Sequence, residues 1–357
     1  MSSVSASAAP AASMPAAVAA PPRKRIEYLD IIRGVCILFV AYFHSGVSLN
    51  FAQYVSSICV HPFFFMAGYF HSTKRSVGDI FHKKVRTLIL PYYVFGIFYF
   101  LVWLLMFHDS GRDVIHTLQA VLYMPTVDFP VEPGLYFLPM MFWGTMILTV
   151  TEKYIKNEPV KFVIMFLISW IGCAWTRHFA FRLPMSLDCA MAVYPYFYLG
   201  FRARKILAFC DGIIEKIRHR WMRVALYLVV TAVNYFLVRV NFLPNVPNIL
   251  NGSWCIILLT HFNTCVIMLL WVYTFRFVEN LKFLRHVNKA LKFVGENSIT
   301  FMLFGHVGLK IGRTVASMLP IPNLFVVKTV YYVVSIVVLI PVALLFSKTR
   351  LKYIFGK

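Results

Sequence analysis

Long apolar segments alternate along the chain with short segments rich in Lys and Arg. Most of the apolar segments approach the roughly 20 residues that a helix needs to cross a bilayer. We assign ten of them: 27–46, 53–71, 87–107, 135–151, 161–177, 186–201, 221–242, 254–275, 297–317 and 323–347. The pattern predicts an all-α fold, a polytopic transmembrane helix bundle of about ten spans, with a further short helix at 112–122 in the acidic connection 108–134.

The distribution of basic residues predicts the orientation of these spans. Connections that would lie on the side of the N-terminus are strongly basic; the one before the third span holds Lys74, Arg75, Lys83, Lys84 and Arg86. The opposite connections hold few basic residues, with none at 47–52, 243–253 or 318–322. Since basic connections remain in the cytoplasm, both termini are expected to be cytoplasmic.

Composition agrees with a membrane protein. Of the 357 residues, 60% are hydrophobic and only 14% are charged. The excess of 35 Lys and Arg over 14 Asp and Glu does not indicate a nucleic-acid partner, because the basic residues lie between apolar segments. We therefore expect an integral membrane protein whose main surroundings are the lipid bilayer.

The same pattern predicts one large domain. No polar stretch is long enough for a second domain, so residues 26–348 are expected to form a single transmembrane unit. Residues 1–25 are rich in Ala, Pro and Ser, end in the basic cluster 23–25, and are expected to be a disordered cytoplasmic tail. Residues 349–357 are expected to form a short basic cytoplasmic tail. The seven cysteines are scattered without a CxxC pair, which predicts neither a disulfide framework nor a metal site.

The first predicted helix contains two residues that are costly in a membrane, Arg33 and His44. They are eleven residues apart, which puts them on one face of a helix with a rise of about 16 Å between them. Asp30 lies three residues before Arg33 and is placed to pair with it. Ionisable residues at this depth usually face the bundle interior or a water-filled cavity. The alternative is that Arg33 extends to the cytoplasmic surface and His44 makes a polar contact near the outer interface.

Several motifs in order resemble those of the acyltransferase-3 family of membrane acyltransferases. "LDIIRGVCILFVAYFH" resembles the family's first helix with its R-x10-H pattern, formed here by Arg33 and His44. "HPFFFMAGYF" (61–70), the basic turn and proline "KKVRTLILPYY" (83–93), "LYFLPMMFW" (135–143) and "GENSITFMLFGH" (295–306) are similar to later family segments. The chain looks most like the stand-alone, fucose 4-O-acetylase-like members.

The resemblance implies transfer of an acetyl or similar acyl group from cytoplasmic acyl-CoA to a hydroxyl of a sugar. The acceptor would belong to a surface polysaccharide or a lipid-linked glycan, and the protein to the bacterial inner (plasma) membrane. Acetyl-CoA would serve as co-substrate, and no metal is implied. His44 would be the catalytic base, while Arg33, Lys83 and Arg86 would bind the phosphates of the donor. The family often has arginine where this chain has Lys83, which keeps the charge but not the planar fork.

Further polar residues are candidates for the acceptor site or the cavity wall. His306, Lys310 and Arg313 follow i, i+4, i+7 spacing in the ninth predicted span and therefore share a helix face. One interpretation is that these residues bind the acceptor or stabilise an oxyanion. The other is that the basic side chains extend to the outer interface and the histidine is an ordinary residue of the core. Asp30 and His61 are two more candidates for lining the cavity.

Three other functions are compatible with these residues. A multi-pass transporter or flippase for a charged solute or glycan would use buried His, Arg and Lys as its path, although no internal repeat supports it. A lipid-linked glycosyltransferase would rely on acidic residues near the outer face, such as Asp128, Glu132 or Asp188. A non-catalytic assembly protein would tolerate replacement of His44.

Overall fold

The computed structural model describes residues 26–47, 59–106, 113–123, 131–179, 181–241, 254–349 and 351. The predicted tail 1–25 and most of the tail 349–357 lie outside these residues. Every regular element in the described ranges is helical, which confirms the all-α prediction. The helices are α1 (Glu27–Ser45), α3 (His61–Tyr69), α4 (Val77–Lys84), α5 (Leu90–Met106), α6 (Val114–Leu122), α7 (Phe137–Tyr154), α8 (Glu158–His178), α9 (Leu187–Ala192), α10 (Tyr194–Lys216), α11 (Arg220–Asn241), α13 (Trp254–Val278), α14 (Arg285–Glu296), α15 (Ser298–Leu303), α16 (Gly305–Ser317) and α17 (Leu324–Lys348).

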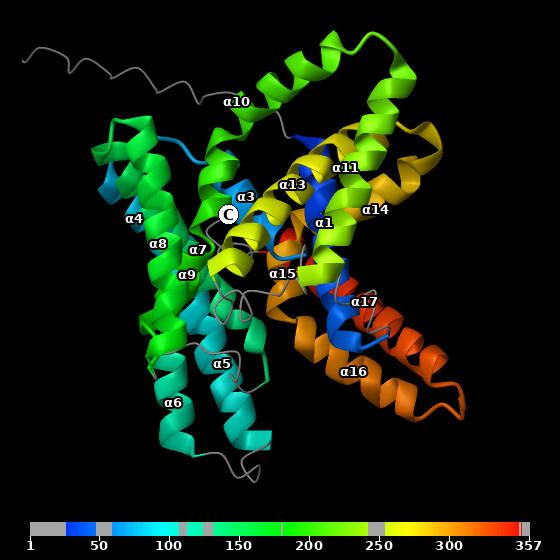
Figure 1. The fold of residues 1–357 in the computed structure, drawn as a ribbon. Helices are drawn as coiled ribbons and strands as arrows, with labels where there is room; N and C mark the ends of the chain where they lie inside the picture. Colours follow the sequence, from blue (N-terminus) through cyan, green and yellow to red (C-terminus); the bar gives the residue numbers. More distant parts are fainter. Residues whose placement is uncertain are drawn as a thin grey trace, which may run out of the picture.

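Each predicted span corresponds to one or two of these helices (Figure 1). Six helical stretches in the described ranges are long and apolar enough to cross a membrane. The predicted sixth and ninth spans are not continuous helices. The helix is interrupted between α9 and α10 in the sixth span, and between α15 and α16 in the ninth. The expected short helix at 112–122 is α6. The number of ten spans and the cytoplasmic termini stay predictions.

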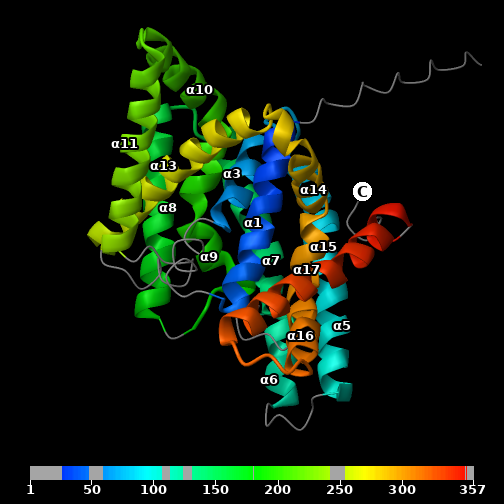
Figure 2. The same cartoon turned by 90° about the vertical axis from the view of Figure 1, so that its right-hand side faces the viewer.

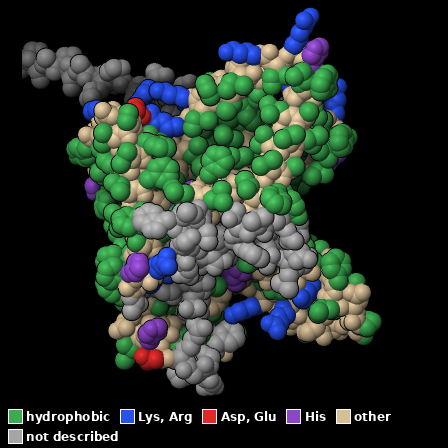
Figure 3. Space-filling view, in the orientation of Figure 1, with side chains coloured by type: hydrophobic (Ala, Val, Ile, Leu, Met, Phe, Trp, Pro, Cys, Tyr) green, Lys and Arg blue, Asp and Glu red, His purple; other side chains and the backbone are tan. Residues whose placement is uncertain are grey.

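The surface also fits a bilayer environment. Large apolar side chains are exposed along the outer faces of α5, α8, α11 and α17, among them Leu101, Val163, Val229 and Val337. Figure 3 shows hydrophobic side chains covering much of one face, with Lys and Arg gathered towards two ends of the molecule. A soluble protein rarely exposes so much apolar surface, and lipid tails would cover it here.

The basic residues 83–86, expected to form a turn before the third span, are instead helical. The helix starts at α4, where Ser76 and Asp79 form a capping box, and continues through a π-helical turn, η1 (Val85–Ile89), into α5. The wider turn ends two residues before Pro91, which has no amide hydrogen to donate to a regular helix. Lys83 and Arg86 therefore lie on the side of a helix and not in a loop.

Helix α1 runs through the interior of the bundle, packed against α3, α13, α14, α15 and α17 (Figure 2). Glycines allow the closest crossings. A Cβ atom on Gly34 would come within 2.0 Å of the Leu291 carbonyl oxygen on α14, and one on Gly68 of α3 within 1.9 Å of the Phe197 oxygen on α10. The first of these contacts fixes α1, which carries Asp30, Arg33 and His44, against α14, and the second fixes α3 against α10.

Candidate active site

The start of α1 holds a charged pair inside the bundle. Arg33 Nη1 donates to Asp30 Oδ1 at 2.8 Å, and the Asp30 side chain is buried. The Arg33 guanidinium also lies over the ring of Phe70, 5.5 Å from its centroid. The pairing expected from the i, i+3 spacing is therefore present, and it offsets much of the cost of burying each charge.

The last turn of α1 brings His44 against His306, the second residue of α16. Their ring centroids are 4.7 Å apart, although 262 positions separate them in the sequence. Helix α1 ends at Gly46, whose φ of +64° lets the chain turn away directly after His44. The two histidines, which the sequence placed in separate clusters, thus form one centre.

Glu132 completes this centre, and the sequence did not single it out as a site residue. Its carboxylate is fully buried and accepts from the backbone N–H of His306 at 2.9 Å. The second carboxylate oxygen pairs with His306 Nδ1 at 2.7 Å. Burial raises the pKa of Glu132 above its ordinary value, against the opposing effect of its hydrogen bonds with His306. A carboxylate in this position fixes the orientation of the imidazole and stabilises its positive charge.

Two cavities meet at the histidine pair. The first, of about 170 Å³, is mainly apolar and is lined by side chains such as Ile37, Phe63 and Leu339. The second, of about 250 Å³, is lined by Lys310, Arg313 and Tyr331. His44 and His306 line both. An apolar chamber and a basic chamber therefore share these two imidazoles, so that groups held in each would meet there.

The other predicted site residues lie at different distances from this centre. Lys310 and Arg313 share the basic chamber, as their helical spacing predicted. His61 lines neither chamber; it is buried with its ring 4.6 Å from that of Tyr196. Lys83 and Arg86 are exposed on the α4–α5 helix and also line neither chamber.

Sequence patterns offered little sign of Glu132. It was noted as an acidic residue of the connection 108–134 and as one of three acidic residues that a glycosyltransferase could use, and it precedes Pro133 and Gly134, which favour a turn. Its partner lies 174 residues further along the chain, so no local spacing links the two. Within the described ranges, no group of three or more His, Cys, Asp or Glu side chains is arranged to hold a metal ion.

The helix bundle and the histidine pair at its two cavities define an integral membrane protein with a polar centre suited to moving protons. The family comparison makes this more specific. The model described as an acyltransferase domain, that of the acyltransferase-3 family, matches residues 26–348, and the chain belongs to that family. Comparison with curated proteins and with solved structures gave no match.

Proposed function

We propose that the chain is a membrane O-acyltransferase that moves an acetyl or similar acyl group from cytoplasmic acyl-CoA to a hydroxyl of a sugar. The acceptor belongs to a surface polysaccharide or a lipid-linked glycan at the bacterial inner membrane. The observation that carries the proposal is the meeting of His44 and His306 at the junction of two chambers, with His306 held by the buried Glu132. Membership of an acyltransferase family supports the same class of reaction.

The proposed reaction uses the two chambers for the two substrates. The apolar chamber takes the acyl end of the donor, and the basic chamber takes the sugar. His44 removes the proton from the attacking hydroxyl as its oxygen bonds to the thioester carbon. The tetrahedral intermediate then collapses, the carbon–sulfur bond breaks, and the thiolate leaves and takes up a proton. The ester is formed on the sugar, and free CoA is released.

His306 is proposed to act beside His44. With the Glu132 carboxylate accepting from Nδ1, the lone pair of His306 lies on Nε2. This imidazole can accept a proton, or as a cation stabilise the oxyanion of the intermediate. Glu132 is a positioning residue in this scheme, since it acts through its two hydrogen bonds with His306.

The donor is proposed to extend along α1. Arg33 lies near the cytoplasmic end of the helix and His44 near the outer end, about 16 Å further along the axis. Phosphates held by Arg33, Lys83 and Arg86 would leave the thioester arm to reach the histidine pair. The Arg33 guanidinium is paired with the Asp30 carboxylate and would contact the phosphates from inside the bundle.

A comparison of surface glycans tests the proposal. Deleting the gene in the source organism and recording glycan mass and NMR spectra should reveal a lost acyl group, which the wild-type gene restores. The variant His44→Ala should reach the membrane in normal amount yet restore nothing, because a general base contributes about 10²–10⁴-fold in rate. His178→Ala, which removes an exposed histidine at the end of α8, should restore fully.

Two results would contradict the proposal. An unchanged glycan after deletion, together with a change in solute or glycan translocation, would favour the transporter. Full acylation by His44→Ala would remove the assigned base while leaving the reaction class in place.

A further inference from the structure

A second polar cavity lies away from the histidine pair, at the end of the bundle where α7 ends and α8 begins. It has a volume of about 480 Å³ and is bounded by the connection between α3 and α4, the ends of α7 and α8, and α10. None of Arg33, Lys83 and Arg86 lines it. Its lining holds five basic residues, Arg75, Lys153, Lys156, Lys161 and Arg202, against two carboxylates, Glu152 and Glu158.

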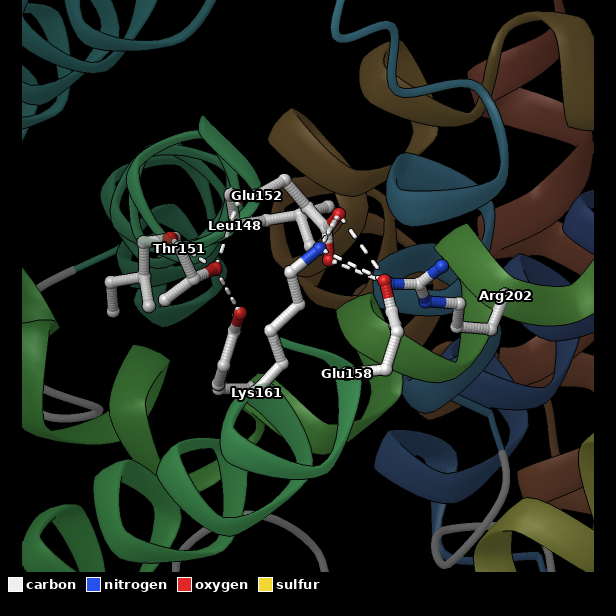
Figure 4. Close-up of polar contacts among 8 residues, drawn as sticks. Leu148, Thr151, Glu152, Glu158, Lys161 and Arg202 are labelled. Carbon is white, nitrogen blue, oxygen red and sulfur yellow. Dashed lines mark hydrogen bonds and ion pairs between the residues drawn. The ribbon is translucent and has the colours of Figure 1, made fainter. Parts of the chain in front are cut away.

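The two carboxylates are already neutralised by two of these cations (Figure 4). Lys161 is buried, and its Nζ lies 2.7 Å from Glu152 and 3.2 Å from Glu158. Arg202 forms ion pairs with the same two residues, at 3.3 Å from Glu152. The four groups make a closed network of two positive and two negative charges. The Lys161–Glu152 pair is buried and fixes this wall of the cavity, because removing one partner of a buried ion pair is costly.

The remaining three basic residues are not neutralised in this way. Arg75, Lys153 and Lys156 are exposed, and in the described part of the chain no carboxylate lies within ion-pair distance of them. Two further polar atoms at the cavity are buried without a hydrogen-bond partner among the described residues, His71 Nε2 and Arg202 Nε. A positively charged cavity with unmet hydrogen-bonding capacity fits a bound anion.

The position of the cavity connects it to the start of α1. His71, which lines the cavity, directly follows Phe70, whose ring lies under the Arg33 guanidinium. Phe201 adds an aromatic ring to the lining. The preference of basic residues for the cytoplasmic side explains why they are at this end of the molecule, but it does not explain a cavity between them. The volume is within the range of small-molecule sites.

We propose that this cavity binds the phosphate-bearing nucleotide end of the acyl-CoA donor, with Arg75, Lys153 and Lys156 contacting the phosphates. The inference rests on the proposed function, since it concerns the donor of that reaction. It shifts the main phosphate contacts from the exposed Lys83 and Arg86 to a cavity with a fixed wall. The donor then runs from this cavity past Phe70 and Arg33 towards the histidine pair.

Binding of adenosine 3′,5′-bisphosphate to the full chain in lipid nanodiscs tests the proposal without requiring acyl transfer. The combined variant Arg75→Gln, Lys153→Gln, Lys156→Gln should lose roughly tenfold or more in affinity, because charge-assisted contacts are lost. The matched control Lys289→Gln removes an exposed lysine of α14 and should bind as the wild type does. Adenosine, which lacks phosphate, should bind weakly to all of them.

The outcomes separate this inference from the proposed function. Unchanged bisphosphate affinity in the triple variant would overturn the cavity assignment, even if the wild type transfers acyl groups. Cavity-dependent binding by a protein that transfers no acyl group would keep the site and refute the proposed function. Repeating the titration in nanodiscs with and without anionic lipid identifies the source of the phosphate. If bisphosphate bound in nanodiscs without anionic lipid but not in nanodiscs with it, the cavity would be assigned to a lipid headgroup and the proposal would be overturned.

Discussion

Replacing Gly34 with alanine is the sharpest test of how α1 is held. Gly34 lies at the crossing of α1 with α14, where an added Cβ would be 2.0 Å from the Leu291 carbonyl oxygen. The contact is reciprocal, since a Cβ on Gly295 of α14 would meet the Asp30 oxygen at 1.9 Å. Both neighbours are backbone atoms, which cannot rotate away as a side chain would.

The size of the effect follows from the gap. An ordinary contact requires about 3.4 Å, so the two helices must separate by about 1.4 Å to admit the methyl group. Overpacking of this kind typically costs about 1–3 kcal/mol. The same shift would move Arg33 and His44 relative to α3 and α16, and a misplacement of about 1 Å at a reacting centre can cost roughly 10²-fold in rate.

Thermal unfolding of the purified full chain in detergent measures the stability part of this prediction. Gly34→Ala should unfold at a lower temperature than the wild type and should lose acyl transfer. Gly212→Ala is the matched control, because nothing lies within 4 Å of the added Cβ and alanine favours a helix by about 1 kcal/mol over glycine. If Gly34→Ala were as stable as the control, α1 and α14 would not cross as closely as described, and the reasoning would fail.

Two further substitutions test the site. Glu132→Gln keeps the size of the side chain and an acceptor for the His306 N–H but loses the negative charge. The kcat should therefore fall by about 10²–10⁴-fold, with a normal yield of folded protein. An unchanged kcat would show that His306 needs no carboxylate. Arg33→Lys keeps a positive charge beside Asp30 but loses the planar guanidinium. The KM for acyl-CoA should therefore rise while kcat stays near that of the wild type. A KM equal to that of the wild type would show that Arg33 does not bind the donor.

Much of the helical architecture follows from local sequence patterns. Apolar segments of about 20 residues predict helices because no other structure satisfies backbone hydrogen bonds in lipid without closing a sheet. The pairing of Asp30 with Arg33 also follows from spacing, since residues three apart on a helix are neighbours. The same holds for Lys310 and Arg313, which line one chamber.

What the sequence did not predict depends on contacts between distant segments. Nothing near Glu132 indicates that its partner is His306, and nothing near His44 indicates that α16 lies beside it. The basic residues 83–86 were expected to form a turn before the span at 87–107, yet they belong to α4 and the π-helical turn η1, which continues into α5. The sequence did not predict the cavity around Arg75 and Lys153 either. Its basic residues were explained by the preference of Lys and Arg for cytoplasmic connections, so nothing marked them as a binding site.

The bond between Glu132 and His306 has a consequence for the order in which the protein matures. The two residues are 174 positions apart, and ribosomes add about 5–20 residues per second. A newly made chain therefore carries Glu132 for roughly 9–35 seconds before His306 has been synthesised. During that interval the carboxylate lacks the partner that it has in the finished bundle. The histidine centre can assemble only late in synthesis, after α16 has joined helices made much earlier.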